Sequence, residues 1–180
     1  MTSLMDHLAR ARAEGITAYG RQAYLIASAV IVLDQLTKAW VLYGLHLRER
    51  GRIDLSPMFD LSFVLNRGVS FGLLTSDGAG RWLLSLFSIA VAAGLAWWVR
   101  RADRPLFSLA VGFIMGGALG NVIDRIRFGG VVDFLDFSGL MFPWVFNVAD
   151  SGITIGVLLL LADGFVSERR NRVGAQPAKE

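Results

Sequence analysis

The sequence predicts an integral membrane protein of the all-α class: a four-transmembrane-helix bundle with a small extracytoplasmic (periplasmic) β segment between helices 1 and 2. Of the 180 residues, 54% are hydrophobic and only 18% are charged, and the mean hydropathy is +0.51. Soluble domains usually carry more charge, about 25%. Four apolar runs each approach the ~20 residues that span hydrocarbon, and backbone groups in lipid must pair internally, so these runs are expected to be helices. The runs lie at about 23–43, 82–99, 106–123 and 147–166.

These runs divide the chain into one transmembrane domain with two polar tails. We expect residues 1–22 to form a cytoplasmic N-terminal tail, residues 23–167 the membrane domain, and residues 168–180 a cytoplasmic C-terminal tail. Three groups of arginines support this orientation, because basic residues favour the cytoplasmic side. They precede the first span, fill the connection between spans two and three, and follow the last span: Arg10, Arg12, Arg21, Arg100, Arg101, Arg104, Arg169, Arg170 and Arg172. Arginines in the first outer segment oppose it, but that segment is longer and also holds acidic residues.

The composition argues against several kinds of site. There are no cysteines, which removes disulfides, thiolate nucleophiles and cysteine-ligated metals. The only histidines are His7, in the polar tail, and His46, and there is no HExxH motif, so neither a zinc protease nor a serine–histidine hydrolase is expected. We therefore expect no metal and no cofactor. The net charge is only +3, and the basic groups are interpreted as topology signals, so no nucleic-acid partner is expected.

The first span contains two charged residues, Asp34 and Lys38, four positions apart. This spacing places both side chains on one face of a helix. They can form an internal salt bridge that neutralises two intramembrane charges, and the pair can also support a site from its own helix. Lys38 lies nearer the outer end, where its ammonium can alternatively extend to the interface.

The outer segment after the first span combines a strand pattern with a polar loop. Apolar residues partly alternate between Ile53 and Leu65, interrupted by Pro57, which predicts short strands at the membrane surface. The stretch Asn66–Gly72 follows, with two glycines, an asparagine and an arginine. It is interpreted as a tight polar loop that returns to the membrane, although a simple turn would have the same composition.

The third span ends in small and polar residues. Gly116 and Gly120 form a small-xxx-small pair that permits a neighbouring helix to approach closely. Asn121 and Asp124 share one helix face at the outer end, followed by Arg125. A structural hydrogen-bond cluster is the expected role, and Asp124 is the main competing candidate for a catalytic carboxylate.

Two further carboxylates, Asp133 and Asp150, lie on either side of an aromatic-rich loop. Asp150 leads directly into the fourth apolar run, and a carboxylate at the mouth of a membrane helix is costly unless it is paired, solvated or used. Two carboxylates near the same end of a membrane helix indicate acid–base chemistry. Capping is the simpler explanation for Asn147 or Asp150, because asparagine is a good N-cap and an acidic first turn suits the helix dipole. Capping does not explain Asp133.

Taken together, five sequence blocks resemble those of the bacterial lipoprotein signal peptidases, also called type II signal peptidases or signal peptidase II. The blocks occur in the order found in that family. Together with the four spans, they cover roughly residues 23–166. The blocks are Asp34–Lys38, Asn66–Phe71, Gly117–Arg125, Val131–Phe134 and Phe146–Ser151.

The resemblance implies an aspartyl endopeptidase of the bacterial cytoplasmic (inner) membrane, with its active site at the outer face. Such an enzyme removes the signal peptide from a prolipoprotein, cleaving just before a cysteine that carries diacylglycerol. The expected partners are diacylglyceryl-modified prolipoproteins and membrane lipid, and we expect a monomer. By motif position the catalytic pair falls on Asp133 and Asp150. Nine other residues match surrounding motif positions and are expected to support the site: Asp34, Lys38, Asn66, Gly68, Asn121, Asp124, Arg125, Asn147 and Ala149.

The carboxylates can carry out the chemistry of a peptidase, but a membrane transporter could use the same residues. Two close carboxylates can supply the base and the acid of amide hydrolysis, because their like charges keep one of them protonated. A small ion- or proton-coupled transporter would use the same carboxylates as a relay along a path through the membrane. Here Asp124, Asp133 and Asp150 gather near one face, with Asp163 near the other. A structural membrane subunit would leave this cluster unexplained.

Overall fold

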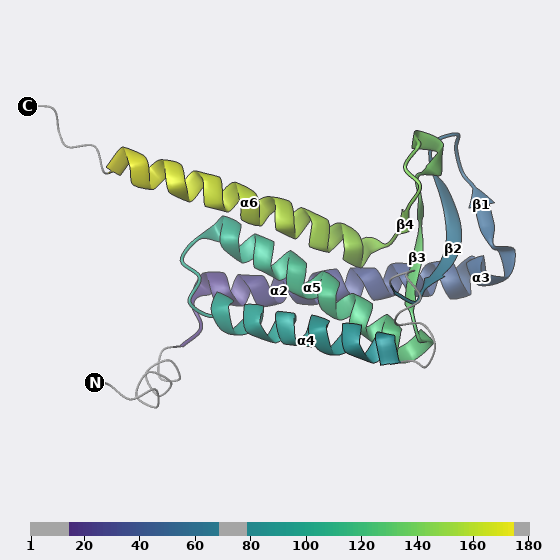
Figure 1. Cartoon of the computed structure of the whole chain (residues 1–180), viewed down its shortest axis with the longest axis horizontal. Helices are drawn as coiled ribbons and strands as arrows, with labels where there is room; N and C mark the ends of the chain where they lie inside the picture. The colour runs from purple at the N-terminus through teal and green to yellow at the C-terminus, as the bar shows by residue number, and fades with distance from the viewer. Residues whose placement is uncertain (1–14, 69–78, 175–180) are drawn as a thin grey trace, which may run out of the picture.

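Four long helices dominate the computed structural model, which describes residues 15–68 and 79–174 (Figure 1). Each is long and apolar enough to cross a membrane, which confirms the predicted fold class. The predicted loop after Gly68 continues into residues that lie outside the described ranges, Ser70 and Phe71 included. The four helices are α2 (Ala18–Ala39, extended by the π-helical turn Trp40–Gly44), α4 (Ala79–Val99), α5 (Pro105–Phe128) and α6 (Val148–Gly174).

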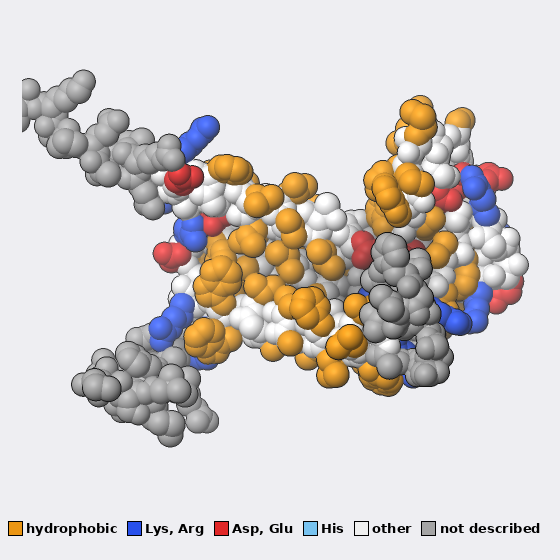
Figure 2. Space-filling view, in the orientation of Figure 1, with side chains coloured by type: hydrophobic (Ala, Val, Ile, Leu, Met, Phe, Trp, Pro, Cys, Tyr) orange, Lys and Arg blue, Asp and Glu red, His pale blue; other side chains and the backbone are white. Residues whose placement is uncertain are grey.

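Helix α5 is the centre of the bundle. In its most apolar stretch 67% of the residues are buried, against 33% or less in the other three helices. The other helices therefore present most of their apolar surface to lipid, and Figure 2 shows hydrophobic side chains over the visible face of the bundle with charged ones towards its two ends. Trp97 and Trp98 are exposed next to Arg100 at one such end, as is typical of aromatic residues at a membrane interface.

Glycines in α5 make the close helix contacts possible. A Cβ on Gly116 would lie 2.7 Å from the Ala27 carbonyl oxygen of α2. A Cβ on Gly117 would lie 2.2 Å from the Ala149 carbonyl oxygen of α6. Backbones at this separation leave no room for a side chain, so the close approach predicted at Gly116 is confirmed, and Gly117, on another side of α5, allows the same approach by α6.

A four-stranded antiparallel sheet stands at the end of the bundle away from both chain ends (Figure 1). Its strands are β1 (Arg52–Asp54), β2 (Asp60–Asn66), β3 (Val131–Asp136) and β4 (Val145–Phe146), in the order β1-β2-β3-β4. The predicted β segment between the first two spans is confirmed as β1 and β2, which flank Pro57. The sequence analysis missed β3 and β4, which come from the connection between α5 and α6 and complete the same sheet.

The two faces of the sheet have different neighbours. Leu65 pairs with Val132 and Val64 pairs with Asp133. Because side chains alternate between the faces of a strand, these two cross-strand pairs point to opposite sides. Val132 belongs to an apolar cluster with Val41 at the end of α2, together with Leu47 of the short helix α3 (Leu47–Arg50). Asp133 faces the other way, towards the start of α6.

Candidate functional site

Asp133 and Asp150 come together where the sheet meets the adjoining ends of α2, α5 and α6. Asn147 connects them: its Nδ2 donates to Asp133 Oδ1 at 2.6 Å, and its Oδ1 accepts from the Asp150 backbone N–H at 2.9 Å. The second contact is an N-cap of α6, which begins at Val148. Asn147 is therefore both the predicted helix cap and a direct partner of Asp133.

Two further amides hold the carboxylates. Asn66 at the end of β2 donates from Nδ2 to Asp133 Oδ2 at 3.1 Å, and Asn121 of α5 donates to Asp150 Oδ1 at 2.8 Å. Each carboxylate thus accepts from neutral amide donors, which orient it without forming an ion pair.

Asp133 holds a proton more strongly than an ordinary aspartate. Its side chain is 2% exposed, and this burial, followed by the negative charge of Asp150, raises its pKa to about 6. The hydrogen bonds from Asn66 and Asn147 act in the opposite direction. Mutual repulsion between two carboxylates is the feature that lets one of them stay protonated while the other is ionised.

A buried ion cluster lies directly behind this pair. The Lys38 ammonium is 2.8 Å from Asp34 Oδ2 and 2.7 Å from Asp124 Oδ2, and all three side chains are at most 2% exposed. The predicted salt bridge between Asp34 and Lys38 is confirmed, with Asp124 as a second partner. The expectation that Lys38 could extend to the interface is wrong, because its ammonium is held inward by two carboxylates.

The ion cluster also fixes the backbone next to each aspartate of the pair. Asp34 Oδ1 accepts from the Ala149 N–H at 2.9 Å, and Ala149 directly precedes Asp150. Asp124 Oδ2 accepts from the Val132 N–H at 3.0 Å, and Val132 directly precedes Asp133. Lys38 therefore joins two carboxylates, one of which holds the backbone before Asp150 and the other the backbone before Asp133.

Gln35 takes part in the same cluster, although the sequence analysis gave it no role. Its Nε2 lies 3.1 Å from Asp34 Oδ2 and 3.0 Å from Asp124 Oδ1. The position of Gln35 inside a short polar run within an apolar span was the available signal. A polar side chain beside two charged ones in a membrane helix needs partners in the protein.

The remaining predicted residues lie around the pair. Gly68 has φ +110° and its N–H donates to Asn66 Oδ1 at 3.1 Å, so the turn after β2 orients the amide that holds Asp133. Only glycine adopts this φ without strain. Arg125 is half-buried, and its positive charge interacts with Asp133 and Asp150 as well as with Asp124.

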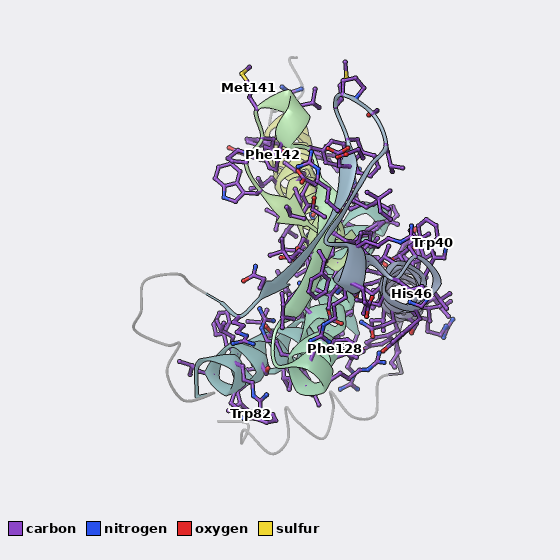
Figure 3. The ribbon with its side chains drawn as sticks, turned by 90° about the vertical axis from the view of Figure 1, so that its right-hand side faces the viewer. Trp40, His46, Trp82, Phe128, Met141 and Phe142 are labelled. Atoms are coloured by element: carbon purple, nitrogen blue, oxygen red, sulfur yellow. The ribbon has the colours of Figure 1, made fainter. Side chains whose placement is uncertain are left out.

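An apolar pocket of about 360 Å³ opens beside Asp150. Phe142 and Trp144 line one wall, their ring centroids 5.1 Å apart, and Ile155 of α6 lines another. Figure 3 shows Phe142 projecting from the β3–β4 connection near Met141. The aromatic connection, about which the sequence analysis drew no conclusion, thus forms an apolar wall next to a titratable group.

Comparisons with known proteins identify the family of this chain. The family model described as "Signal peptidase (SPase) II" matches residues 26–166. A lipoprotein signal peptidase of Caulobacter vibrioides is 55% identical over 85% of this chain and 92% of its own length. One from Methylorubrum extorquens is 43% identical over 82% and 87% respectively.

Solved structures show the same architecture. One bacterial membrane enzyme superposes with a TM-score of 0.71 at 26% identity, covering 93% of this chain and 98% of its own. A second has a TM-score of 0.68 at 29% identity, covering 83% and 95%. The matches extend through all four spans and both aspartate segments, so the chain belongs to the signal peptidase II family.

Proposed function

We propose that this protein is a membrane aspartyl endopeptidase that removes the signal peptide from prolipoproteins, cleaving before a diacylglyceryl-modified cysteine. Asp133 and Asp150 are its catalytic pair. The observation that carries this assignment is the position of Asn147, which donates to the Asp133 carboxylate and accepts from the Asp150 backbone N–H, so that the two aspartates meet at one site. The relatives named as lipoprotein signal peptidases supply the substrate class.

The reaction uses one ionised and one protonated carboxyl group. The ionised group takes a proton from water, and the resulting hydroxide attacks the carbonyl carbon of the scissile amide. The protonated group then donates its proton to the departing nitrogen as the C–N bond breaks. Because the pair titrates as a unit, the resting proton belongs to Asp133 and Asp150 together. The positive charge of Arg125 near both groups helps to stabilise the developing oxyanion.

The competing carboxylate Asp124 is better suited to support than to proton transfer. It is fully buried, and its oxygens are occupied by Lys38, by Gln35 and by the Val132 N–H. A water molecule approaching Asp124 would have to displace these contacts. Asp34 is engaged in the same way, by Lys38 and the Ala149 N–H.

The apolar pocket beside Asp150 provides a route for the substrate. Its wall of Phe142, Trp144 and Ile155 continues onto the lipid-facing surface of α6, where Leu158 is exposed. The diacylglyceryl chains can therefore remain in the bilayer while the peptide bond next to the modified cysteine reaches the carboxylates. No cofactor is required for this chemistry, because the two carboxyl groups of the pair supply both the base and the acid.

The proposed location is the cytoplasmic (inner) membrane, with both termini cytoplasmic and the sheet outside. Arg104, between α4 and α5, forms a 2.7 Å ion pair with Asp163 of α6. This contact places the basic α4–α5 connection and the last turns of α6 at one end of the bundle, opposite the sheet. A basic end favours the cytoplasm. We propose that the monomer is sufficient for cleavage, because all of these site residues come from one chain.

The transporter hypothesis gains no support. A relay needs titratable groups along the membrane path, yet Asp133, Asp150 and the Lys38 cluster share the end next to the sheet. Asp163 lies at the other end and is occupied by Arg104. The family comparisons point to a peptidase as well.

The test is direct cleavage by the purified protein. A diacylglyceryl-modified prolipoprotein, incubated with the full chain in detergent and a chelator, should give a smaller product whose new N-terminus is the modified cysteine. The same prolipoprotein without the lipid is the control and should remain uncut. Cleavage at a different bond, or a requirement for an added divalent cation, would contradict the proposal.

A further inference from the structure

A second pocket, of about 340 Å³, lies on the side of the sheet away from Asp133. Leu65 and Val132 line it, and these two residues are the cross-strand pair that faces opposite to Val64 and Asp133. His46 and Phe128 border the same pocket, and Figure 3 places both on the side of the molecule away from Phe142. The proposed peptidase reaction does not use this pocket.

Two fixed guanidinium groups give the pocket its charge. Arg48 of α3 lies over the Phe63 ring at 5.8 Å, and Arg127 of α5 lies over the Phe128 ring at 4.9 Å. Both arginines line the pocket. Stacking on aromatic rings restricts each guanidinium while leaving its N–H donors available at the edges.

The positive charge of this pocket is not balanced by ion pairs. Within the described ranges, neither Arg48 nor Arg127 forms a salt bridge, and Arg127 instead donates to the neutral Gln35 Oε1 at 3.1 Å. Glu49 is the only carboxylate among the residues that line the pocket. Two guanidinium groups thus face one carboxylate, which favours an anionic occupant.

The position of the pocket points to a lipid as the source of that anion. Trp40 and Tyr43 are both exposed in the π-helical turn that extends α2, six and three residues before His46, where an interfacial aromatic belt belongs. Towards the bundle centre, α2 exposes Leu36 and Leu33. A charged pocket at the interface therefore continues into an apolar helix surface suited to acyl chains.

We propose that this pocket, formed by His46, Arg48 and Arg127, binds the phosphodiester headgroup of an anionic phospholipid whose acyl chains lie along α2. Arginine donors match phosphate oxygens in geometry and charge. An acidic peptide would satisfy the guanidinium groups but not the adjoining lipid-facing surface. On the proposed topology the lipid belongs to the outer leaflet, on the side of the bundle away from the substrate pocket.

The test compares two lipids and three variants by native mass spectrometry of the purified full chain. Phosphatidylglycerol should bind more tightly than phosphatidylcholine with the same acyl chains. Arg48→Gln and Arg127→Gln should each weaken phosphatidylglycerol binding about tenfold, the loss expected for one charged hydrogen bond. Arg50→Gln is the matched control, because Arg50 is on the same short helix but does not line the pocket; it should leave binding unchanged.

Four results would overturn the inference. These are equal binding of the two lipids, an equal loss with Arg50→Gln, unchanged binding in the Arg48→Gln protein, and displacement of the lipid by millimolar inorganic phosphate. If Arg127→Gln fails to fold because Gln35 loses its partner, the lipid affinity of Arg48→Gln, compared with that of Arg50→Gln, tests the inference alone. Prolipoprotein cleavage in neutral detergent should be unchanged by Arg48→Gln, so lipid binding and peptidase activity can fail separately.

Discussion

Asn147 Nδ2 lies 2.6 Å from Asp133 Oδ1, so the residue that caps α6 also holds the carboxyl group of β3. The same side chain accepts from the Asp150 N–H. One asparagine thereby sets the position of a strand carboxylate relative to a helix carboxylate. Its capping role and its contact with Asp133 can be separated by mutation.

Asn147→Ser should retain the helix cap and lose the contact with Asp133. Serine caps about as well as asparagine, but its hydroxyl is too short to replace the amide. We expect a roughly 10- to 100-fold fall in kcat, because a hydrogen bond to a charged group contributes about 1.5–3 kcal/mol, with little change in Tm. Asn147→Ala should lose about 1 kcal/mol of stability in addition. Equal cleavage by wild type and Asn147→Ser would show that the 2.6 Å contact has no role in turnover.

Gly120→Ala should destabilise the bundle next to the ion cluster. The new Cβ would lie 2.8 Å from Asp34 Oδ2 and 3.3 Å from the Ala149 Cβ. Overpacking of this kind costs about 1–3 kcal/mol. Gly94→Ala is the control, since nothing lies within 4 Å of its Cβ in the middle of α4. Thermal unfolding in detergent should show a lower Tm for Gly120→Ala only.

Lys38→Met should be among the most damaging single substitutions outside the pair. It would leave Asp34 and Asp124 buried without their shared cation, and breaking a buried ion pair costs about 3–5 kcal/mol. Adding Asp124→Asn to Lys38→Met should recover part of the loss, because one uncompensated charge is removed. Denaturation of the wild type, Lys38→Met, Asp124→Asn and the double mutant measures this coupling, and purely additive losses would contradict a shared cluster.

The pH dependence of cleavage should follow the last proton on the pair. The pKa of Asp133 is raised to about 6 by burial and by Asp150, so the singly protonated pair is lost as pH rises through that value. We expect kcat/KM to fall with a one-proton slope above about pH 6, and to fall again at low pH when both groups are protonated. The apparent values belong to the pair.

Asn66→Ala tests the sign of this dependence. The hydrogen bond from Asn66 lowers the pKa of Asp133, so its removal should shift the alkaline limb to higher pH. A pH profile that is flat from about pH 5 to about 8 in the wild type would show that no such proton is required. A shift to lower pH in Asn66→Ala would show that the contact acts differently.

The sequence alone predicted the four membrane spans and the two aspartates that come together at the site. Long apolar runs are local signals, and the small-xxx-small pair Gly116 and Gly120 is readable in one stretch of chain. Strands β3 and β4 were not predicted because their pairing is long-range, as in Leu65 with Val132, and β4 has only two residues. A strand that short carries no periodic pattern of its own.

The contacts between side chains inside the site were also only partly predictable. The spacing of Asp34 and Lys38 indicates a pair within one helix, but the second contact, to Asp124, depends on how α2 packs against α5. The contact from Ala149 to Asp34 has the same origin. Such contacts arise from the meeting of helices that are far apart in sequence, so no local pattern contains them.

The central claim is that Asp133 and Asp150 act as one catalytic unit. The decisive measurement is prolipoprotein cleavage by folded Asp133→Asn, Asp150→Asn and double-mutant proteins, with Asp124→Asn as the control carboxylate. Asparagine preserves size but cannot exchange the proton, so each single mutant should be inactive and the double mutant no worse than either, because the groups act together. Asp124→Asn should be less stable yet still cleave. Full cleavage by well-folded Asp133→Asn, with none by Asp124→Asn, would contradict the account and move the catalytic pair to Asp124 and Asp150.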